Sequence, residues 1–327
     1  MRHKTNVNLK KKEIRMKLFK LRNQSIFQTV KGCFGGMAVA ATALSVASCG
    51  DKEKEGDGAD GAAILRFSAI PDEDTTGQAA RFKPVADYLA KALGVKVEFV
   101  PSATYGASVE KFENGDIHLA WFGGVSGEQA RQAVDGAKAL AAGKKDLAFK
   151  SYFVANAATG LTKSDDFPTA IADMTFTYGS SGSTSGCVMP SHFIMEKTGK
   201  TPMEFFQKKP IGFSGAHDKT ALQVQDGTFQ AGVLSYGKYE SMVKENKLDP
   251  AKCVVVWETP PFADYNFTAH PALEKAFGEG FVAKLQKALL DCEDPLALKA
   301  LGRDELVKVT NETFIPVAKV MEKVKFD

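Results

Sequence analysis

From Ile64 onward, short strand-like runs of apolar residues alternate with longer stretches in which apolar residues recur at helical spacing. The first run ends at Pro71, and the first helical stretch ends at Gly94. In this part of the chain we expect strands at 64–70, 95–100 and 117–122, and helices at 79–93 and about 105–112. Strands that alternate with helices of this length are typical of an α/β protein with largely parallel sheets.

The same alternation resumes after residue 157. We expect strands at 175–178, 211–213, 229–234, 254–257 and 265–269, helices at 183–197 and 217–225, and further helices up to the C-terminus. We therefore predict two α/β lobes, formed by residues 63–157 plus 262–327 and by residues 158–261. Because ligands bind outside the carboxyl ends of strands in open α/β sheets, functional residues should lie in the loops at those ends.

Residues 1–48 have the composition of an export signal. Ten Lys or Arg and one Glu precede a short stretch of small and apolar residues at 33–44, too short for a permanent membrane anchor. Met16 is an alternative start with a shorter basic region. The run Ser45-Val46-Ala47-Ser48 before Cys49 resembles a bacterial lipobox, in which the Cys becomes the lipidated first residue. The alternative is an ordinary cleavage site followed by a free Cys49.

Residues 49–62 are predicted to be a flexible tether between membrane and domain, because 51–61 hold no apolar residue larger than Ala. Removing residues 1–48 takes away 10 of the 42 basic and 1 of the 39 acidic residues, which leaves 32 and 38, a net charge of −6. The remaining 279 residues therefore lack the basic surface of a nucleic-acid-binding protein, and they suffice for two lobes.

Three cysteines follow Cys49, namely Cys187, Cys253 and Cys292, and their spacing matches neither a CxxC motif nor a Cys/His metal site. We expect them to be small buried hydrophobic residues, with no metal or cofactor. A disulfide between Cys253 and Cys292 is the alternative in an oxidising compartment.

The most informative loop connects a predicted strand to a predicted helix and reads Tyr178-Gly179-Ser180-Ser181-Gly182-Ser183-Thr184-Ser185-Gly186. Glycines let a ligand approach the backbone, and free N–H groups with the helix dipole favour an anion at a helix start. The hydroxyls of Ser181, Ser183, Thr184 and Ser185 add neutral donors. These features predict a site for a tetrahedral oxyanion, and the alternative is a helix cap with a flexible loop before it.

Two other interpretations of this loop are disfavoured. A phosphate-binding P-loop requires Lys after the last glycine, where Cys187 stands. A nucleophile elbow requires Ser between its glycines, where Thr184 stands at the centre.

Three more candidates lie in other loops. His217 falls in the first turn of a predicted helix, where its ring can donate to an anion, although a lone His there is often solvated. If it does, binding of a fully ionised oxyanion should tighten as pH falls from about 8 to 6. In the first lobe, Tyr105 offers a hydroxyl that can close over the anion and Phe122 an apolar contact, with core packing as the alternative.

Together these loops resemble the phosphonate- and phosphite-binding family of type II periplasmic binding proteins, and most closely a branch labelled as selenate binders. The similarity covers about residues 64–316. It rests, in order, on Ile70-Pro71-Asp72-Glu73, Tyr105, Ala120-Trp121-Phe122-Gly123, Gly182-Ser183-Thr184-Ser185-Gly186, Ser214-Gly215-Ala216-His217-Asp218 and Thr259-Pro260-Pro261. It implies that the oxyanion is held by Ser183, Thr184, Ser185, His217 and Tyr105.

The family places acids in the cleft where an aminoalkyl tail is recognised. Leu234-Ser235-Tyr236 has no acid at one expected place, and Asp264 matches the other, so the sequence argues against an aminoalkylphosphonate. The resemblance implies a monomeric lipoprotein of the cell envelope that captures a small oxyanion and delivers it to an ABC permease and its ATPase, without catalysis. Phosphite, a phosphonate, phosphate, selenate and sulfate all remain open.

Two other functions were weighed against transport. A receptor that presents the same ligand to a sensor kinase would use the same loops. An envelope hydrolase would use Ser183, Ser185 or Cys187 with His217, but the sequence offers no third group to orient the base.

The lipid anchor is directly testable. Cys49→Ser should prevent lipidation and move the protein from the membrane fraction to the soluble fraction, because 51–61 have no apolar side chain to hold it there. Fractionation followed by immunoblotting measures this, with Cys292→Ser as the matched control. Membrane attachment of Cys49→Ser would contradict the lipobox interpretation.

Overall fold

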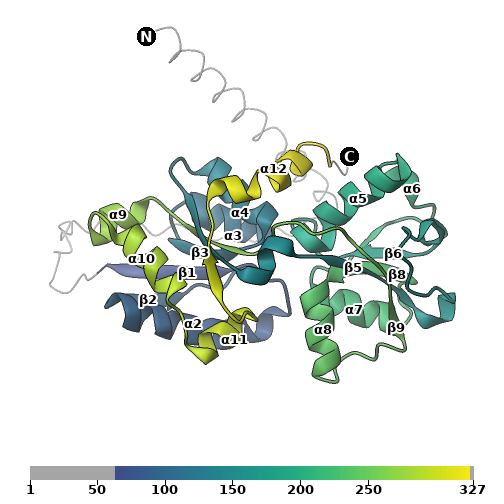
Figure 1. Cartoon of the computed structure of the whole chain (residues 1–327), viewed down its shortest axis with the longest axis horizontal. Coiled ribbons are helices and arrows are strands. Elements are labelled where there is room, and N and C mark those ends of the chain that lie inside the picture. The colour runs from purple at the N-terminus through teal and green to yellow at the C-terminus, as the bar shows by residue number, and fades with distance from the viewer. Residues whose placement is uncertain (1–62, 325–327) are drawn as a thin grey trace, which may run out of the picture. The chain divides into compact units, whose positions relative to one another are not determined.

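The computed structural model describes residues 63–324, which form two β-sheets flanked by helices (Figure 1). The export signal, Cys49 and the tether lie outside the described residues. The first sheet has six strands in the order β11-β4-β10-β3-β1-β2. Their bounds are Leu306–Lys308, Lys138–Gly143, Asn266–Ala269, Leu119–Phe122, Ile64–Ala69 and Lys96–Phe99.

Helices cover both faces of the first sheet. They are α2 (Gln78–Leu93), α3 (Tyr105–Glu113), α4 (Gly124–Ala133), α9 (Ala272–Phe277), α10 (Phe281–Leu290), α11 (Pro295–Leu301) and α12 (Ile315–Met321). Helices α10 and α11 pack against α2 on one face, and α3 and α12 pack against α4 on the other (Figure 1). The chain thereby buries the strand residues Leu65, Phe67 and Ala69 completely.

The second sheet has five strands in the order β7-β6-β8-β5-β9. Their bounds are Gly212–Phe213, Phe176–Tyr178, Ala231–Ser235, Ser151–Asn156 and Cys253–Glu258. Its helices are α5 (Met189–Thr198), α6 (Pro202–Phe205), α7 (His217–Gln225) and α8 (Tyr236–Lys244). Short 3₁₀ turns occur at Thr75–Gly77, Lys144–Ala148, Ala157–Thr159, Thr169–Asp173 and Asn311–Phe314, and a π-turn at Thr184–Val188.

The two-lobe α/β prediction is confirmed, but the strand directions are more mixed than predicted. Strand β1 pairs parallel to β2 and β3, and β6 pairs parallel to β7 and β8. In contrast, β10 is antiparallel to β3 and β4, and β5 is antiparallel to β8 and β9. Strands β5 and β10 each begin at the junction between the lobes and run away from it. Their neighbours run toward the junction, so the pairs are antiparallel.

The chain crosses between the lobes twice, and the two crossings are joined side by side. Phe149 and Phe262 exchange both backbone hydrogen bonds, at 2.8 and 2.9 Å. Because β5 belongs to the second sheet, the first crossing lies near Phe149, and the predicted boundary at residue 157 is corrected. No Gly or Pro separates Lys150 from β5, so nothing local in the sequence marks the crossing.

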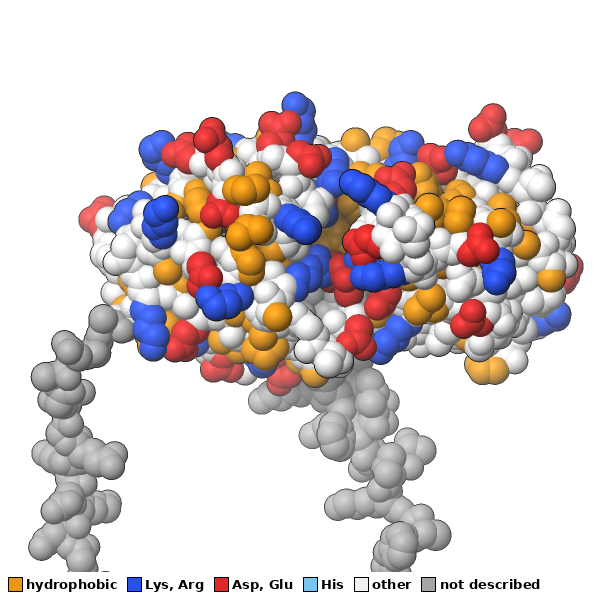
Figure 2. Space-filling view, turned by 90° about the horizontal axis from the view of Figure 1, so that it is seen from below, with side chains coloured by type: hydrophobic (Ala, Val, Ile, Leu, Met, Phe, Trp, Pro, Cys, Tyr) orange, Lys and Arg blue, Asp and Glu red, His pale blue; other side chains and the backbone are white. Residues whose placement is uncertain are grey.

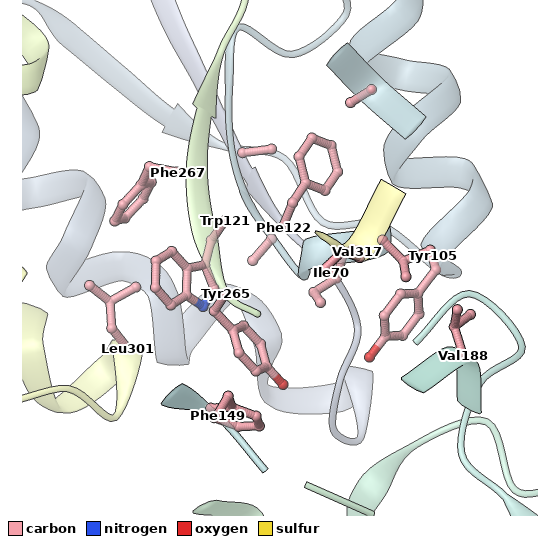
Figure 3. Packing of buried hydrophobic residues seen from close by; sticks show 14 of the residues in the cluster. Ile70, Tyr105, Trp121, Phe122, Phe149, Val188, Tyr265, Phe267, Leu301 and Val317 are labelled. Atoms are coloured by element: carbon pink, nitrogen blue, oxygen red, sulfur yellow. The ribbon is translucent and has the colours of Figure 1, made fainter. Parts of the chain in front are cut away.

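A buried ion pair stabilises this junction from the C-terminal segment. The Arg303 guanidinium donates to both carboxylate oxygens of Asp146, at 2.5 and 2.6 Å, and Asp146 is fully buried. The central guanidinium carbon of Arg303 lies 4.8 Å from the ring centre of Tyr265 and 5.8 Å from that of Phe149. The backbone oxygen of Asp146 accepts the N–H of Asp264 at 2.9 Å. Figure 3 shows Phe149 and Tyr265 side by side at this place.

The structure also tests the predictions about the cysteines. Cys187, Cys253 and Cys292 are all buried and free, as expected for small hydrophobic residues, and the alternative disulfide is not formed. Between residues 63 and 324, no helix has both the length and the apolarity that a bilayer crossing requires.

The ion pair leads to a stability prediction. Arg303→Gln should lower the free energy of unfolding by about 3–5 kcal/mol, because it leaves the buried Asp146 carboxylate without its partner. Arg303→Lys should lose less, since it keeps the charge but not the two-pronged contact. Urea unfolding measures both, and Lys299→Gln on the exposed side of α11 is the control. Equal stability of Arg303→Gln and the control would show that the pair does not hold the junction.

Candidate functional site

Six of the predicted site residues are buried where loops of the two lobes meet. None of them has more than 4% of its surface exposed: Tyr105, Ser183, Thr184, Ser185, His217 and Asp264. All of them except Asp264 lie at the start of a helix that follows a strand, as expected for an open α/β sheet, and Asp264 lies just before β10.

The hydroxyl-rich loop begins where β6 ends at Tyr178 and turns into the helix that leads to α5. The Ser183 side chain accepts the N–H of Gly186 at 3.0 Å, so this serine acts as a helix cap. The next five residues, Thr184–Val188, form a π-turn before α5 begins at Met189. The predicted helix start is therefore confirmed, with a wider first turn of the kind frequent at functional sites.

Loops from both lobes approach Thr184 and Asp264 closely. The N–H of Val125 donates to the Thr184 hydroxyl oxygen at 3.0 Å across the two lobes. The N–H of Gly124 donates to Asp264 Oδ1, also at 3.0 Å. A Cβ atom on Gly123 would lie 3.0 Å from the Thr184 hydroxyl and 3.1 Å from Asp264 Oδ1. A larger residue at Gly123 would require the Thr184 hydroxyl or the Asp264 carboxylate to move by a few tenths of an ångström. The sequence analysis predicted that a strand ends before Gly123 and Gly124, but it did not predict that a helix, α4, begins there.

Asp264 is a buried carboxyl group that is poised between its two charge states. Burial raises its pKa to about 7, against the hydrogen bond from Gly124 and the hydroxyls of Thr184 and Ser185, which lower it. The hydroxyl of Ser185 lies near the carboxyl but makes no hydrogen bond of normal geometry with it, and Asp264 Oδ2 has no partner in the protein. One carboxyl oxygen is therefore fixed by the backbone and the other is available to a ligand.

His217 is the first residue of α7, and its ring is buried rather than solvated. Its Nδ1 accepts the N–H of Ser235 at 3.3 Å, which assigns the proton to Nε2. Nε2 has no partner in the protein. Burial lowers the pKa of His217 to about 4, although Asp72 raises it. In the ligand-free protein the ring is therefore neutral between pH 6 and 8, and the change of its charge on anion binding stays a prediction.

Tyr105 opens α3 and faces the hydroxyl-rich loop from the first lobe. A Cβ atom on Gly182 would lie 2.9 Å from the Cβ of Tyr105, and the phenol interacts with the Ser183 hydroxyl. Burial raises the pKa of Tyr105 well above its usual value. Tyr105 therefore remains a neutral hydroxyl donor at any physiological pH.

Two predicted site residues are not brought into this cluster. Ser181 is exposed on the outer side of the loop. The ring of Phe122 packs edge-on against Phe112, with ring centres 5.6 Å apart, and in Figure 3 it points away from the Tyr105 hydroxyl. Core packing, the alternative considered for Phe122, describes its observed environment.

Asp72 is a neighbour of the site that sequence reasoning recorded only as part of a motif. It follows β1, is buried, and accepts the hydroxyl of Tyr265 at 2.9 Å. Against the effect of burial, the charges of Arg81 and Lys238 and the hydrogen bond from Tyr265 lower the pKa of Asp72, so it is ionised. A carboxyl on Pro71-Asp72 after a strand has no distinctive local signal, and only the fold brings it beside His217.

The cluster combines neutral donors with a single proton-sharing group. Its atoms without protein partners are Ser185 Oγ, His217 Nε2 and Asp264 Oδ2. An unpaired buried polar atom is costly, so such atoms mark where a ligand completes the hydrogen bonds. Two donors and one carboxyl oxygen fit a small oxyanion. Among the described residues, no group of three or more His, Cys, Asp or Glu is arranged to hold a metal ion.

Comparison with known proteins shows the family to which the chain belongs. Residues 67–314 match the family model described as the periplasmic phosphonate substrate-binding protein of an ABC transporter. A Prochlorococcus marinus protein named "probable ABC transporter phosphite binding protein PhnD1" is 35% identical over 232 residues, covering 70% of this chain and 77% of its own. The Mycolicibacterium smegmatis phosphate-import protein PhnD is 30% identical over 250 residues, covering 72% and 76%.

A solved structure extends the match to three dimensions. The structure of PhnD1 from Prochlorococcus marinus in complex with methylphosphonate has a TM-score of 0.75 and 31% sequence identity. The alignment covers 80% of this chain and 98% of that one. The chain belongs to the phosphonate-binding family of periplasmic substrate-binding proteins of ABC transporters.

Proposed function

We propose that this protein captures a phosphonate- or phosphite-type anion that carries one proton, and delivers it to an ABC permease. The observation that carries the proposal is the group of unpartnered buried atoms on Ser185, His217 and Asp264. Ser185 and the neutral imidazole donate to the oxyanion, Thr184 and Tyr105 line it, and Asp264 shares one proton with it.

Asp264 favours an anion with an ionisable proton over one without. With a pKa of about 7, this carboxyl is about half ionised at neutral pH. A carboxylate repels fully ionised selenate or sulfate, whereas a phosphonate or phosphite monoanion can donate its proton to Oδ2. A protein carboxyl and a ligand that share one proton avoid that repulsion. The proposal therefore departs from the selenate branch that the sequence most resembles.

The relatives support the same ligand class. The structural relative binds methylphosphonate, and the two sequence relatives are named for phosphite and phosphate. These ligands share a tetrahedral centre with an oxygen that is protonated near neutral pH. The absence of an acid in Leu234-Ser235-Tyr236 argues against an ammonium-bearing tail.

A hydrolase does not fit the geometry, and the family consists of transport proteins rather than enzymes. Burial raises the pKa of the Cys187 thiol far above the range of a reactive thiolate. His217 Nδ1 accepts a backbone N–H from Ser235, so no carboxylate orients the ring as a general base. Ser183 is engaged as a helix cap.

We also propose that the protein is exported and held at the cell envelope by a lipid on Cys49. The lipobox-like run before Cys49 and the polar tether after it support this proposal. A monomer on such a tether meets the permease by diffusion over the membrane surface.

The first binding prediction concerns the Ser185 hydroxyl. Ser185→Ala should weaken methylphosphonate binding by about 1–3 kcal/mol, because one donor to a charged group is lost. Folding should be unaffected, since Ser185 Oγ has no partner in the protein. Calorimetric titration measures the affinity, with Ser181→Ala, an exposed serine of the same loop, as the control. Equal affinity of the two variants would place the anion elsewhere.

The second binding prediction concerns pH. Selenate has no proton to share, so its binding requires protonated Asp264 and should weaken about tenfold between pH 6 and pH 8. Asp264→Asn should abolish this change of selenate affinity with pH, called the pH slope below. It should also reduce the ratio of the methylphosphonate affinity to the selenate affinity. His217→Gln should weaken both ligands but keep the slope, because a pKa of about 4 lies below this window. A slope that persists in Asp264→Asn and vanishes in His217→Gln would reverse the assignment.

A further inference from the structure

The segment 72–74, which follows β1 in the first lobe, contacts the starts of two helices in the second lobe. The N–H of His217, at the start of α7, donates to the backbone oxygen of Asp72 at 3.1 Å. The N–H of Asp74 donates to Asp218 Oδ2 at 3.3 Å. These contacts lie beside the anion cluster but not in it, because they use the backbone of His217 and not its ring.

Glu73 in the middle of this segment lies between two cations. Its Oε1 is 2.5 Å from Arg81 of its own lobe and 2.5 Å from Lys238 of the other lobe. Figure 2 shows the molecule from below, and acidic and basic side chains lie close together near the middle of that view. The Lys238 side chain is only 18% exposed and that of Glu73 only 28%, so water screens this pair less than a fully exposed one.

Lys238 is also close in the chain to the group that orients His217. It lies in the first turn of α8, and its backbone N–H donates to Ser235 Oγ at 3.3 Å. The backbone N–H of the same serine donates to His217 Nδ1. Lys238 thus extends toward the opposite lobe from the end of β8 that fixes the imidazole, and its charge lowers the pKa of His217.

We propose that the Glu73–Lys238 pair is an interlobe latch that sets how long a bound anion is retained. The pair joins two lobes and exists only when they are closed, so its free energy adds to the closed form alone. Arg81 holds Glu73 in place from within its own lobe. This inference rests on the proposed function, because a latch affects retention only if the lobes close over a ligand.

The test is a double-mutant cycle with methylphosphonate as the probe. Lys238→Gln and Glu73→Gln should each speed methylphosphonate release about fivefold in stopped-flow measurements, with little change in the association rate. If the two side chains act as a pair, the double variant should be no worse than the worse single variant. Lys238→Arg should restore slow release because it keeps the charge. Lys244→Gln removes a charge from the exposed last turn of the same helix and is the control.

The release rates and the ligand-free protein together decide the outcome. Release rates in Lys238→Gln equal to those in Lys244→Gln, or additive effects in the double variant, would overturn the latch. If wild type binds no oxyanion, the proposed function fails, and small-angle scattering of the ligand-free proteins decides instead. A larger radius of gyration for Lys238→Gln than for wild type then supports the latch, and equal radii reject it.

Discussion

The ion pair between Asp146 and Arg303 connects three parts of the chain that are far apart in sequence but meet where the lobes join. Asp146 precedes the first crossing, Arg303 lies in the C-terminal segment, and the Asp146 backbone holds the N–H of Asp264 just after the second crossing. Two charges this deeply buried are tolerated only because each satisfies the other with two short hydrogen bonds. Asp264, the carboxyl proposed to face the ligand, is therefore held through its backbone by the residue that forms the buried ion pair.

In the proposed site, recognition depends more on the sharing of a proton than on the attraction between opposite charges. The proposed donors to the ligand are hydroxyls and a neutral imidazole. Among the groups of the cluster that have an atom without a hydrogen-bond partner, only the carboxyl can carry a charge at neutral pH. Neutral donors accept any tetrahedral oxyanion, so they discriminate weakly. The carboxylate repels every anion that lacks a proton and so weakens its binding. Specificity is the difference between the binding free energies of two ligands, and this repulsion produces such a difference. Burial produces both properties at once, since it keeps His217 neutral and raises the pKa of Asp264.

The sequence predicted the elements with strong periodicity and the loops with unusual composition. The helix at 217–225 agrees with α7 to the residue, and Ser183, Thr184, Ser185, His217 and Tyr105 are brought together. The crossing before β5 was placed too late, because the sequence analysis predicted no strand at Ser151–Asn156, and distant pairing decides to which sheet that strand belongs. Composition also could not separate Ser181 from Ser185, since the turn alone directs one hydroxyl outward and the other inward. The pKa values depend on burial by the opposite lobe, which no local pattern contains.

His217 links the two tasks that a binding protein must perform. Its ring Nε2 has no partner among the described residues and is proposed to donate to the anion, while its backbone N–H donates to Asp72 in the other lobe. A site whose donors are neutral forms no ion pair with the anion, so contacts made when the lobes close add to the free energy that its hydrogen bonds supply. Those contacts include the Val125–Thr184 hydrogen bond and the Glu73–Lys238 pair. Selectivity is thus proposed to depend mainly on Asp264 and retention mainly on Glu73 and Lys238, while His217 and Thr184 take part in both.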